Sequence, residues 1–291
     1  MKSAFVYLSC AMIFAGLLST PVHAEGVHYD VFVTASGTNL VIGGYDDANT
    51  TAIVPEGQMR VFGGEVVGSG TGSPFESEAP GEPGFRASPQ SVLNNSSLTT
   101  PAGTYSALAG STPLMFNFQP ITIGAMTRNL YFWDGTGNVN FSPVGSNVVL
   151  GLTKTGAGGW TSSINGSSSG ILVGNTIQNT GSTGFVHTHL YTSIADNGAA
   201  PDQGFYLYSL QLQMTGYASS DPVYFVFGAI DPLALAAQFA DHEAFETAHG
   251  LAEGWVESNL VAVPEPSSIA LAGLGVAGLA GAALRRRMRK R

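Results

Sequence analysis

Two short motifs place side chains that commonly bind metal ions two positions apart. The first motif is His28-Tyr29-Asp30, and the second is His187-Thr188-His189. Side chains two positions apart in a β-strand point to the same face of the sheet, so each pair can aim at one ion. Three imidazole nitrogens and one carboxylate oxygen suit tetrahedral zinc. The spacing therefore predicts a zinc site made of His28, Asp30, His187 and His189. The alternative is an exposed or hydrogen-bonded histidine pair without a metal.

A further group of potential ligands lies near the end of the body. His242, Glu246 and His249 are spaced so that they share one face of a helix. They could bind zinc as well, but a solvated polar face is the preferred interpretation. The segment is not a His-Glu-x-x-His metalloprotease helix, because Glu246 stands where the second histidine is needed.

Calcium is the second choice of ion. Two loops could supply its oxygen ligands: Asp46, Asp47 and Asn49, or Asp196, Asn197 and Asp202. Neither loop has the full calcium-loop pattern with a terminal Glu. Aspartate and asparagine side chains that form turns explain both loops equally well.

No general base accompanies the histidine motifs, so we expect that the chain is not an enzyme. A hydrolase that uses a zinc-bound water is the third hypothesis. The second is a structural or adhesive component of extracellular polysaccharide without metal, which would contact sugars through exposed aromatic side chains. The run Tyr131-Phe132-Trp133 could form such a platform, although core packing is its preferred use.

The elements that must position these residues are mainly β-strands. Val27–Thr34 alternates in polarity, and after the turn at 36–39 the segment Leu40–Ile42 returns, which indicates a hairpin. Many short strands without intervening helices favour an antiparallel β-sandwich or a jelly-roll-like body over residues 25–262. The region 68–89, rich in Gly, Pro, Ser and Glu, is expected to be a long loop. The other expected strands are 59–62, 114–118, 129–133, 147–152, 170–173, 185–191, 204–214 and 222–227.

A helical segment is expected at about 231–260, at the end of the body. Asp231-Pro232 fits an N-cap followed by proline at the first helical position. Gly250 is expected to separate two helices or to kink one.

Charge is divided unevenly along the chain, whose formal net charge is −9. The body keeps nearly all of the twenty acidic residues and only four basic ones: Arg60, Arg86, Arg128 and Lys154. Such a body repels phosphate backbones, which excludes nucleic acid as a partner.

The first 24 residues have the pattern of a signal peptide. Lys2 precedes the apolar stretch 4–18, and Val22-His23-Ala24 is a small-x-small cleavage signal. The single cysteine, Cys10, lies inside this segment, so the mature chain is expected to contain no disulfide. Export implies the secretion translocon and signal peptidase as partners.

The last 29 residues combine three features. Pro264-Glu265-Pro266 comes first, an apolar stretch at about 267–284 follows, and the basic end at 285–291 closes the chain. The apolar stretch is close to the shortest length that spans a membrane as a helix. Basic residues after it predict that this end stays in the cytoplasm, with the body on the other side. Those residues are Arg285, Arg286, Arg287, Arg289, Lys290 and Arg291.

This tail, at 263–291, resembles a PEP-CTERM sorting domain. The resemblance implies recognition and cutting near Pro264–Pro266 by an exosortase, a membrane enzyme. The body would be held transiently at the inner membrane, outside the cytoplasm, and then pass to the cell surface or the extracellular matrix.

The body is similar to a PEP-CTERM subfamily associated with genes under the zinc uptake regulator, which implies zinc binding or handling. This likeness rests on His28-x-Asp30, Gly43-Gly44-x-Asp46-Asp47, Arg60-Val61-Phe62-Gly63, Phe132-Trp133-Asp134-Gly135-Thr136-Gly137 and His187-x-His189-Leu190.

Overall fold

The structure is a computed structural model that describes most of the body. The described residues are 29–46, 53–54, 59–68, 74–77, 81–94, 105–156, 158–197 and 199–261. The expected signal peptide, His28, the sorting tail and its apolar stretch lie outside them.

The smaller of two large sheets carries the N-terminal hairpin. Its strand order is β16-β6-β1-β2-β3, and β7 pairs with β1. Strands β1 and β2 are buried along almost their whole length. Their hydrophobic and polar residues therefore alternate less strictly than in a strand with one exposed face. The strands are β1 (Tyr29–Ser36), β2 (Asn39–Asp46), β3 (Ile53–Val54), β6 (Phe85–Ala87), β7 (Tyr105–Ser106) and β16 (Val186–Thr188).

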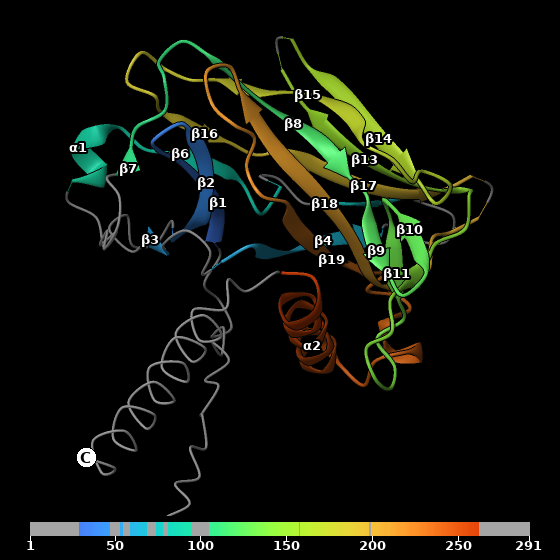
Figure 1. The fold of residues 1–291 in the computed structure, drawn as a ribbon. Helices are drawn as coiled ribbons and strands as arrows, with labels where there is room; N and C mark the ends of the chain where they lie inside the picture. The colour runs from blue at the N-terminus through green and yellow to red at the C-terminus, as the bar shows by residue number, and fades with distance from the viewer. Residues whose placement is uncertain are drawn as a thin grey trace, which may run out of the picture.

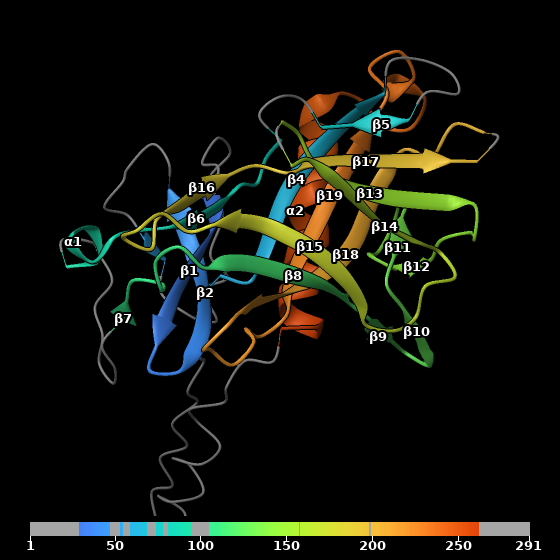
Figure 2. The ribbon, with the colours of Figure 1, turned by 90° about the horizontal axis from the view of Figure 1, so that it is seen from above.

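The larger sheet has eleven strands and curls around the core (Figures 1 and 2). Its main path is β12-β11-β18-β19-β4-β5-β17-β13-β14; β8 pairs with β18, and β15 pairs with β8. These strands are β4 (Val61–Gly68), β5 (Phe75–Glu76), β8 (Pro113–Gln119), β11 (Tyr131–Trp133), β12 (Ser142–Pro143), β13 (Val148–Lys154), β14 (Trp160–Asn165), β15 (Leu172–Asn179), β17 (Tyr191–Asp196), β18 (Gly204–Met214) and β19 (Val223–Ile230). A separate hairpin joins β9 (Ile121–Ile123) and β10 (Met126–Arg128).

One hydrophobic core joins the two large sheets. Val31 and Val33 of β1 belong to the same cluster of buried residues as Phe225 of β19 and Leu212 of β18. The Phe225 ring stacks on Tyr208 with centroids 5.0 Å apart. Packing of this kind fixes the smaller sheet on the larger one, and with it the strands that carry Asp30 and His187.

Helix α2 (His242–Asn259) covers the part of the larger sheet formed by β4 and β19 (Figure 1). The Asp241 side chain accepts a hydrogen bond from the backbone N–H of Ala244 at 2.8 Å and caps the helix. Phe245, fully buried, packs where Gly228 leaves space, because a Cβ there would lie 2.5 Å from the Phe245 ring. The other helices among the described residues are short: α1 (Gln90–Leu93) and the 3₁₀ turn η1 (Leu235–Ala237).

The prediction of a mainly β body with a helical C-terminal segment is confirmed, with differences in detail. The pairings β1–β6 and β4–β19 are parallel, so a purely antiparallel body is wrong. The helix begins at His242 rather than near Asp231, whose side chain accepts from the Leu233 N–H and closes a turn. Helix α2 also continues through Gly250. None of the helices in the described part is long and apolar enough to cross a membrane.

Two tyrosines of β18 make stability sensitive to alkaline pH. Burial raises the pKa of the Tyr206 and Tyr208 hydroxyls above their ordinary value of 10. Above that pH the unfolded chain releases protons that the folded chain retains, so the free energy of unfolding falls as pH rises.

Each tyrosine is expected to lower the free energy of unfolding by about 1 kcal/mol at roughly one pH unit above its ordinary pKa. Urea unfolding at a series of alkaline pH values measures this slope. Burial raises the pKa of the Tyr131 and Tyr224 hydroxyls as well. Tyr208→Phe should therefore reduce the slope by less than half, and an unchanged slope would contradict the assignment.

Candidate metal centre

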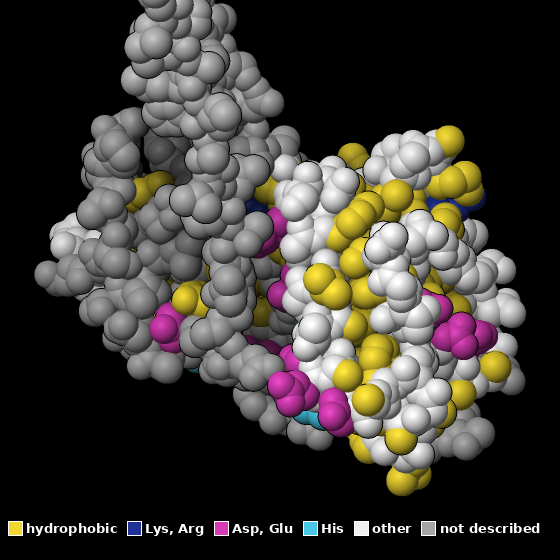
Figure 3. All heavy atoms as spheres, turned by 90° about the horizontal axis from the view of Figure 1, so that it is seen from below, with side chains coloured by type: hydrophobic (Ala, Val, Ile, Leu, Met, Phe, Trp, Pro, Cys, Tyr) yellow, Lys and Arg dark blue, Asp and Glu magenta, His cyan; other side chains and the backbone are white. Residues whose placement is uncertain are grey.

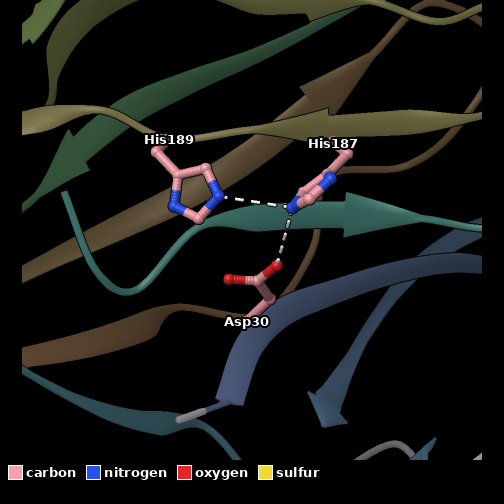
Figure 4. Close-up of side chains that lie close together, drawn as sticks. All are labelled: Asp30, His187 and His189. Carbon is pink, nitrogen blue, oxygen red and sulfur yellow. Dashed lines mark hydrogen bonds and ion pairs between the residues drawn. The ribbon is translucent and has the colours of Figure 1, made fainter. Parts of the chain in front are cut away.

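Three sequence-predicted ligands meet around the short strand β6. Asp30 lies on β1, His187 lies on β16, and His189 follows one residue after β16 ends (Figure 4). Strand β6 lies between the other two, pairing in parallel with β1 and antiparallel with β16. It thereby brings together side chains that more than half of the chain separates.

The donor atoms of the three side chains converge. The Nε2 atoms of His187 and His189 are 3.2 Å apart, and His187 Nε2 lies 3.6 Å from Asp30 Oδ2. One donor atom from each residue lies within 4.8 Å of both others. Tetrahedral zinc with Zn–N bonds of about 2.0–2.1 Å holds neighbouring ligand atoms about 3.3 Å apart. The separations of 3.2 and 3.6 Å that involve His187 are close to that value.

The Asp30 carboxylate is held in place by the backbone. Its side chain is only 1 % exposed, and Oδ1 accepts a hydrogen bond from the Gly84 N–H at 2.7 Å. This bond turns Oδ2 toward His187 (Figure 4). Gly84 also leaves the necessary space, because a Cβ at this position would lie 2.5 Å from Asp30 Oδ1 and 2.7 Å from the His189 ring.

The His189 ring is oriented by groups on its far side. Its Nδ1 lies 3.0 Å from the Gly81 carbonyl oxygen and 3.7 Å from Glu82 Oε1. Both oxygens are acceptors, so Nδ1 carries a hydrogen, and Nε2 is the ring nitrogen that faces His187. Outer partners of this kind fix the tautomer of metal-binding histidines.

Solvent reaches the centre from the side of His187. The His187 side chain is 37 % exposed and that of His189 is 16 % exposed, whereas Asp30 is buried. A cation can therefore enter, while the carboxylate that attracts it is shielded from water. Low local dielectric strengthens that attraction.

The other predicted candidates have different outcomes. His28 and Asp47 lie outside the described residues. Asp196 forms a turn in which its carbonyl oxygen accepts from the Ala199 N–H at 3.3 Å. In the aromatic run, Tyr131 and Trp133 are buried, so core packing is confirmed for them over an exposed sugar platform.

The helical group of potential ligands divides into two environments. His249 is buried, and its Nε2 donates to the Val226 carbonyl oxygen at 2.9 Å, so the prediction of a solvated position is wrong for it. His242 and Glu246 are instead joined by Glu65 of β4, with donor atoms within 4.8 Å of one another.

Sequence reasoning missed Glu65, Glu82 and Gly84. Glu65 and Glu82 belong to no motif with the histidines. The only available signal for Gly84 was its place in a Gly-Pro-rich stretch, which indicated a loop.

Comparison with known families gives one match. Residues 262–287 match the PEP-CTERM protein-sorting motif. This motif is a sorting signal that exosortase recognises, and it implies export and anchoring of the C-terminus in the membrane before processing. The match does not extend to the body, and the subfamily associated with the zinc uptake regulator is not supported. No curated protein and no solved structure matches the chain.

Proposed function

We propose that the body is a zinc-binding, non-catalytic module of an exported protein that exosortase processes and delivers to the cell surface or extracellular matrix. The observation that carries the proposal is the convergence of His187 Nε2, His189 Nε2 and Asp30 Oδ2. Two imidazoles and one carboxylate are a ligand set that zinc accepts, with a fourth position for water or another side chain. His28 is a candidate for that position from its spacing alone.

The ligand set favours zinc over calcium, the second choice. Calcium takes six to eight oxygen ligands, whereas two of the three converging donors are nitrogens. The acidic body also concentrates cations near its surface.

Binding is favoured over hydrolysis because no general base in a suitable position is found among the residues that the structure describes. The Glu82 carboxylate contacts Nδ1 of His189, on the side of the ring opposite to the converging atoms. A base that activates a zinc-bound water must instead reach the open coordination position.

Calorimetric titration of the purified full chain with zinc chloride tests the proposal. His187→Ala and His189→Ala are each expected to weaken binding at this centre by at least about 100-fold, because losing an outer partner alone costs roughly 10–100-fold. Thr188→Ala is the matched control, since its side chain points to the opposite face of β16.

Equal binding by the wild type and all three variants would show that these histidines hold no zinc. A chain that binds no zinc at all would favour the structural or adhesive alternative.

A further inference from the structure

A second group of metal-binding side chains lies where helix α2 meets the larger sheet. Glu65 belongs to β4, while His242 and Glu246 lie one turn apart at the start of α2. One donor atom from each lies within 4.8 Å of both others. The group shares no residue with the centre at Asp30, His187 and His189.

The positions of these three side chains are set by packing. The His242 ring stacks on Phe245 with an interplanar angle of 13°. Phe245 is fully buried over Gly228 of β19, and Gly228 is the register partner of Glu65. The helix therefore approaches the sheet directly beside Glu65, and its first turn is fixed there by the Asp241 cap.

The Glu246 carboxylate makes this group more than a surface cluster. Its side chain is 32 % exposed, but the Oε1 atom is buried and makes no hydrogen bond in the described part of the structure. The contact found for that oxygen is His242 Nε2 at 3.7 Å, longer than a hydrogen bond. A buried carboxylate oxygen without a hydrogen bond is costly, and a second carboxylate within 4.8 Å adds repulsion.

A cation between the three groups would remove both costs. The face of the molecule seen in Figure 3, from below, shows acidic side chains on both sides of a histidine and few basic side chains. His242 is 60 % exposed, which leaves an approach from solvent. One imidazole and two carboxylates are ligands that zinc accepts, and water can complete the coordination.

We propose that Glu65, His242 and Glu246 bind a divalent metal ion, for which zinc is the probe, and that this ion fastens the start of α2 to β4. The ion replaces a weak contact between a histidine and the buried Oε1 atom of a partly exposed glutamate by bonds to both elements. This site is independent of the one proposed above, because neither needs the other to bind.

The test is calorimetric titration of the full chain with zinc chloride, comparing Glu246→Gln with the control Glu243→Gln. Both substitutions remove one negative charge from the first turns of α2, but Glu243 is exposed and outside the group. The wild type and Glu243→Gln are expected to bind two equivalents, and Glu246→Gln one. In the His187→Ala/His189→Ala background the remaining equivalent should disappear with Glu246→Gln.

Amide hydrogen exchange gives a second reading on the same samples. Zinc is expected to slow exchange in the first turns of α2 in the wild type and in Glu243→Gln, but not in Glu246→Gln. If Glu246→Gln retains the full zinc stoichiometry, or if zinc leaves α2 exchange unchanged in the wild type, the second site is disproved. A wild type that binds one equivalent, lost in Glu246→Gln and kept in His187→Ala, would support this site and refute the first.

Discussion

Replacing Gly84 by alanine is expected to lower the zinc affinity of the Asp30 centre by about 10–100-fold, as for other groups that orient metal ligands. It is also expected to reduce the free energy of unfolding by about 1–3 kcal/mol, the usual cost of overpacking. One methyl group has this double effect because the added Cβ would lie 2.5 Å from Asp30 Oδ1 and 2.7 Å from the His189 ring.

The two losses have a common origin. Both Asp30 and the start of β6 are buried, so neither side can move away freely. Displacing the carboxylate lengthens its hydrogen bond from the Gly84 N–H, and displacing the His189 ring moves Nε2 away from His187. The stability of the fold and the geometry of the centre therefore both depend on the absence of a side chain at Gly84.

Zinc titration and urea unfolding of Gly84→Ala measure the two effects. Gly250→Ala is the matched control, because an added Cβ at this helical glycine meets no atom within 4 Å. The control should bind zinc like the wild type and gain up to about 1 kcal/mol of stability from helix propensity. Wild-type zinc affinity in Gly84→Ala would show that the glycine does not shape the centre.

Replacing Glu265 by alanine is expected to abolish removal of the sorting tail in a host that contains an exosortase. Glu265 lies within the matched sorting motif at 262–287. An unprocessed chain keeps its apolar stretch and basic end, so the whole protein should stay in the membrane fraction.

Fractionation followed by mass measurement separates processed from unprocessed chains. Glu243→Ala provides the same chemical change on the exposed surface of α2, outside the motif, and should be processed normally. Release of the Glu265→Ala chain at the wild-type rate would refute a role for this glutamate in recognition.

The hairpin and the histidine spacing were predictable because they depend on neighbours in the sequence. Strands β1 and β2 are joined by a turn whose Gly37 has a φ of +60°, a conformation that glycine adopts easily. His187 and His189 share a face because side chains two positions apart in a strand point the same way, which is also a local effect. The convergence of these histidines with Asp30 was a hypothesis that spacing alone could not decide.

Strand β6 shows why the rest was not predictable. Its three residues, Phe85–Ala87, lie in a region whose Gly, Pro and Glu content indicates a loop. They form a strand because β1 and β16 offer backbone partners on both sides. The parallel pairing of β4 with β19 likewise depends on a backbone partner that is distant in the sequence. This pairing determines where Glu65 meets α2.

The predicted start of the helix near Asp231 was wrong for another reason. Asp231-Pro232 and Asp241-His242 both look like helix starts, since each places an aspartate at a potential N-cap. Only the second is followed by a face that packs on the sheet, with Phe245, Ala248 and Ala252 buried. Tertiary burial thus selected between two local signals of similar strength.

Asp30 and His187 lie on strands that pair with opposite sides of β6, so an ion bound to both would act as a crosslink. The expected mature chain has no cysteine, so it cannot restrict its unfolded state by disulfides. A link between residues 30 and 187 closes a loop of more than half the chain, which in the chain-entropy account of crosslinks is worth about 5 kcal/mol. A protein exposed outside the cell would then gain or lose that restraint reversibly with the zinc content of its surroundings.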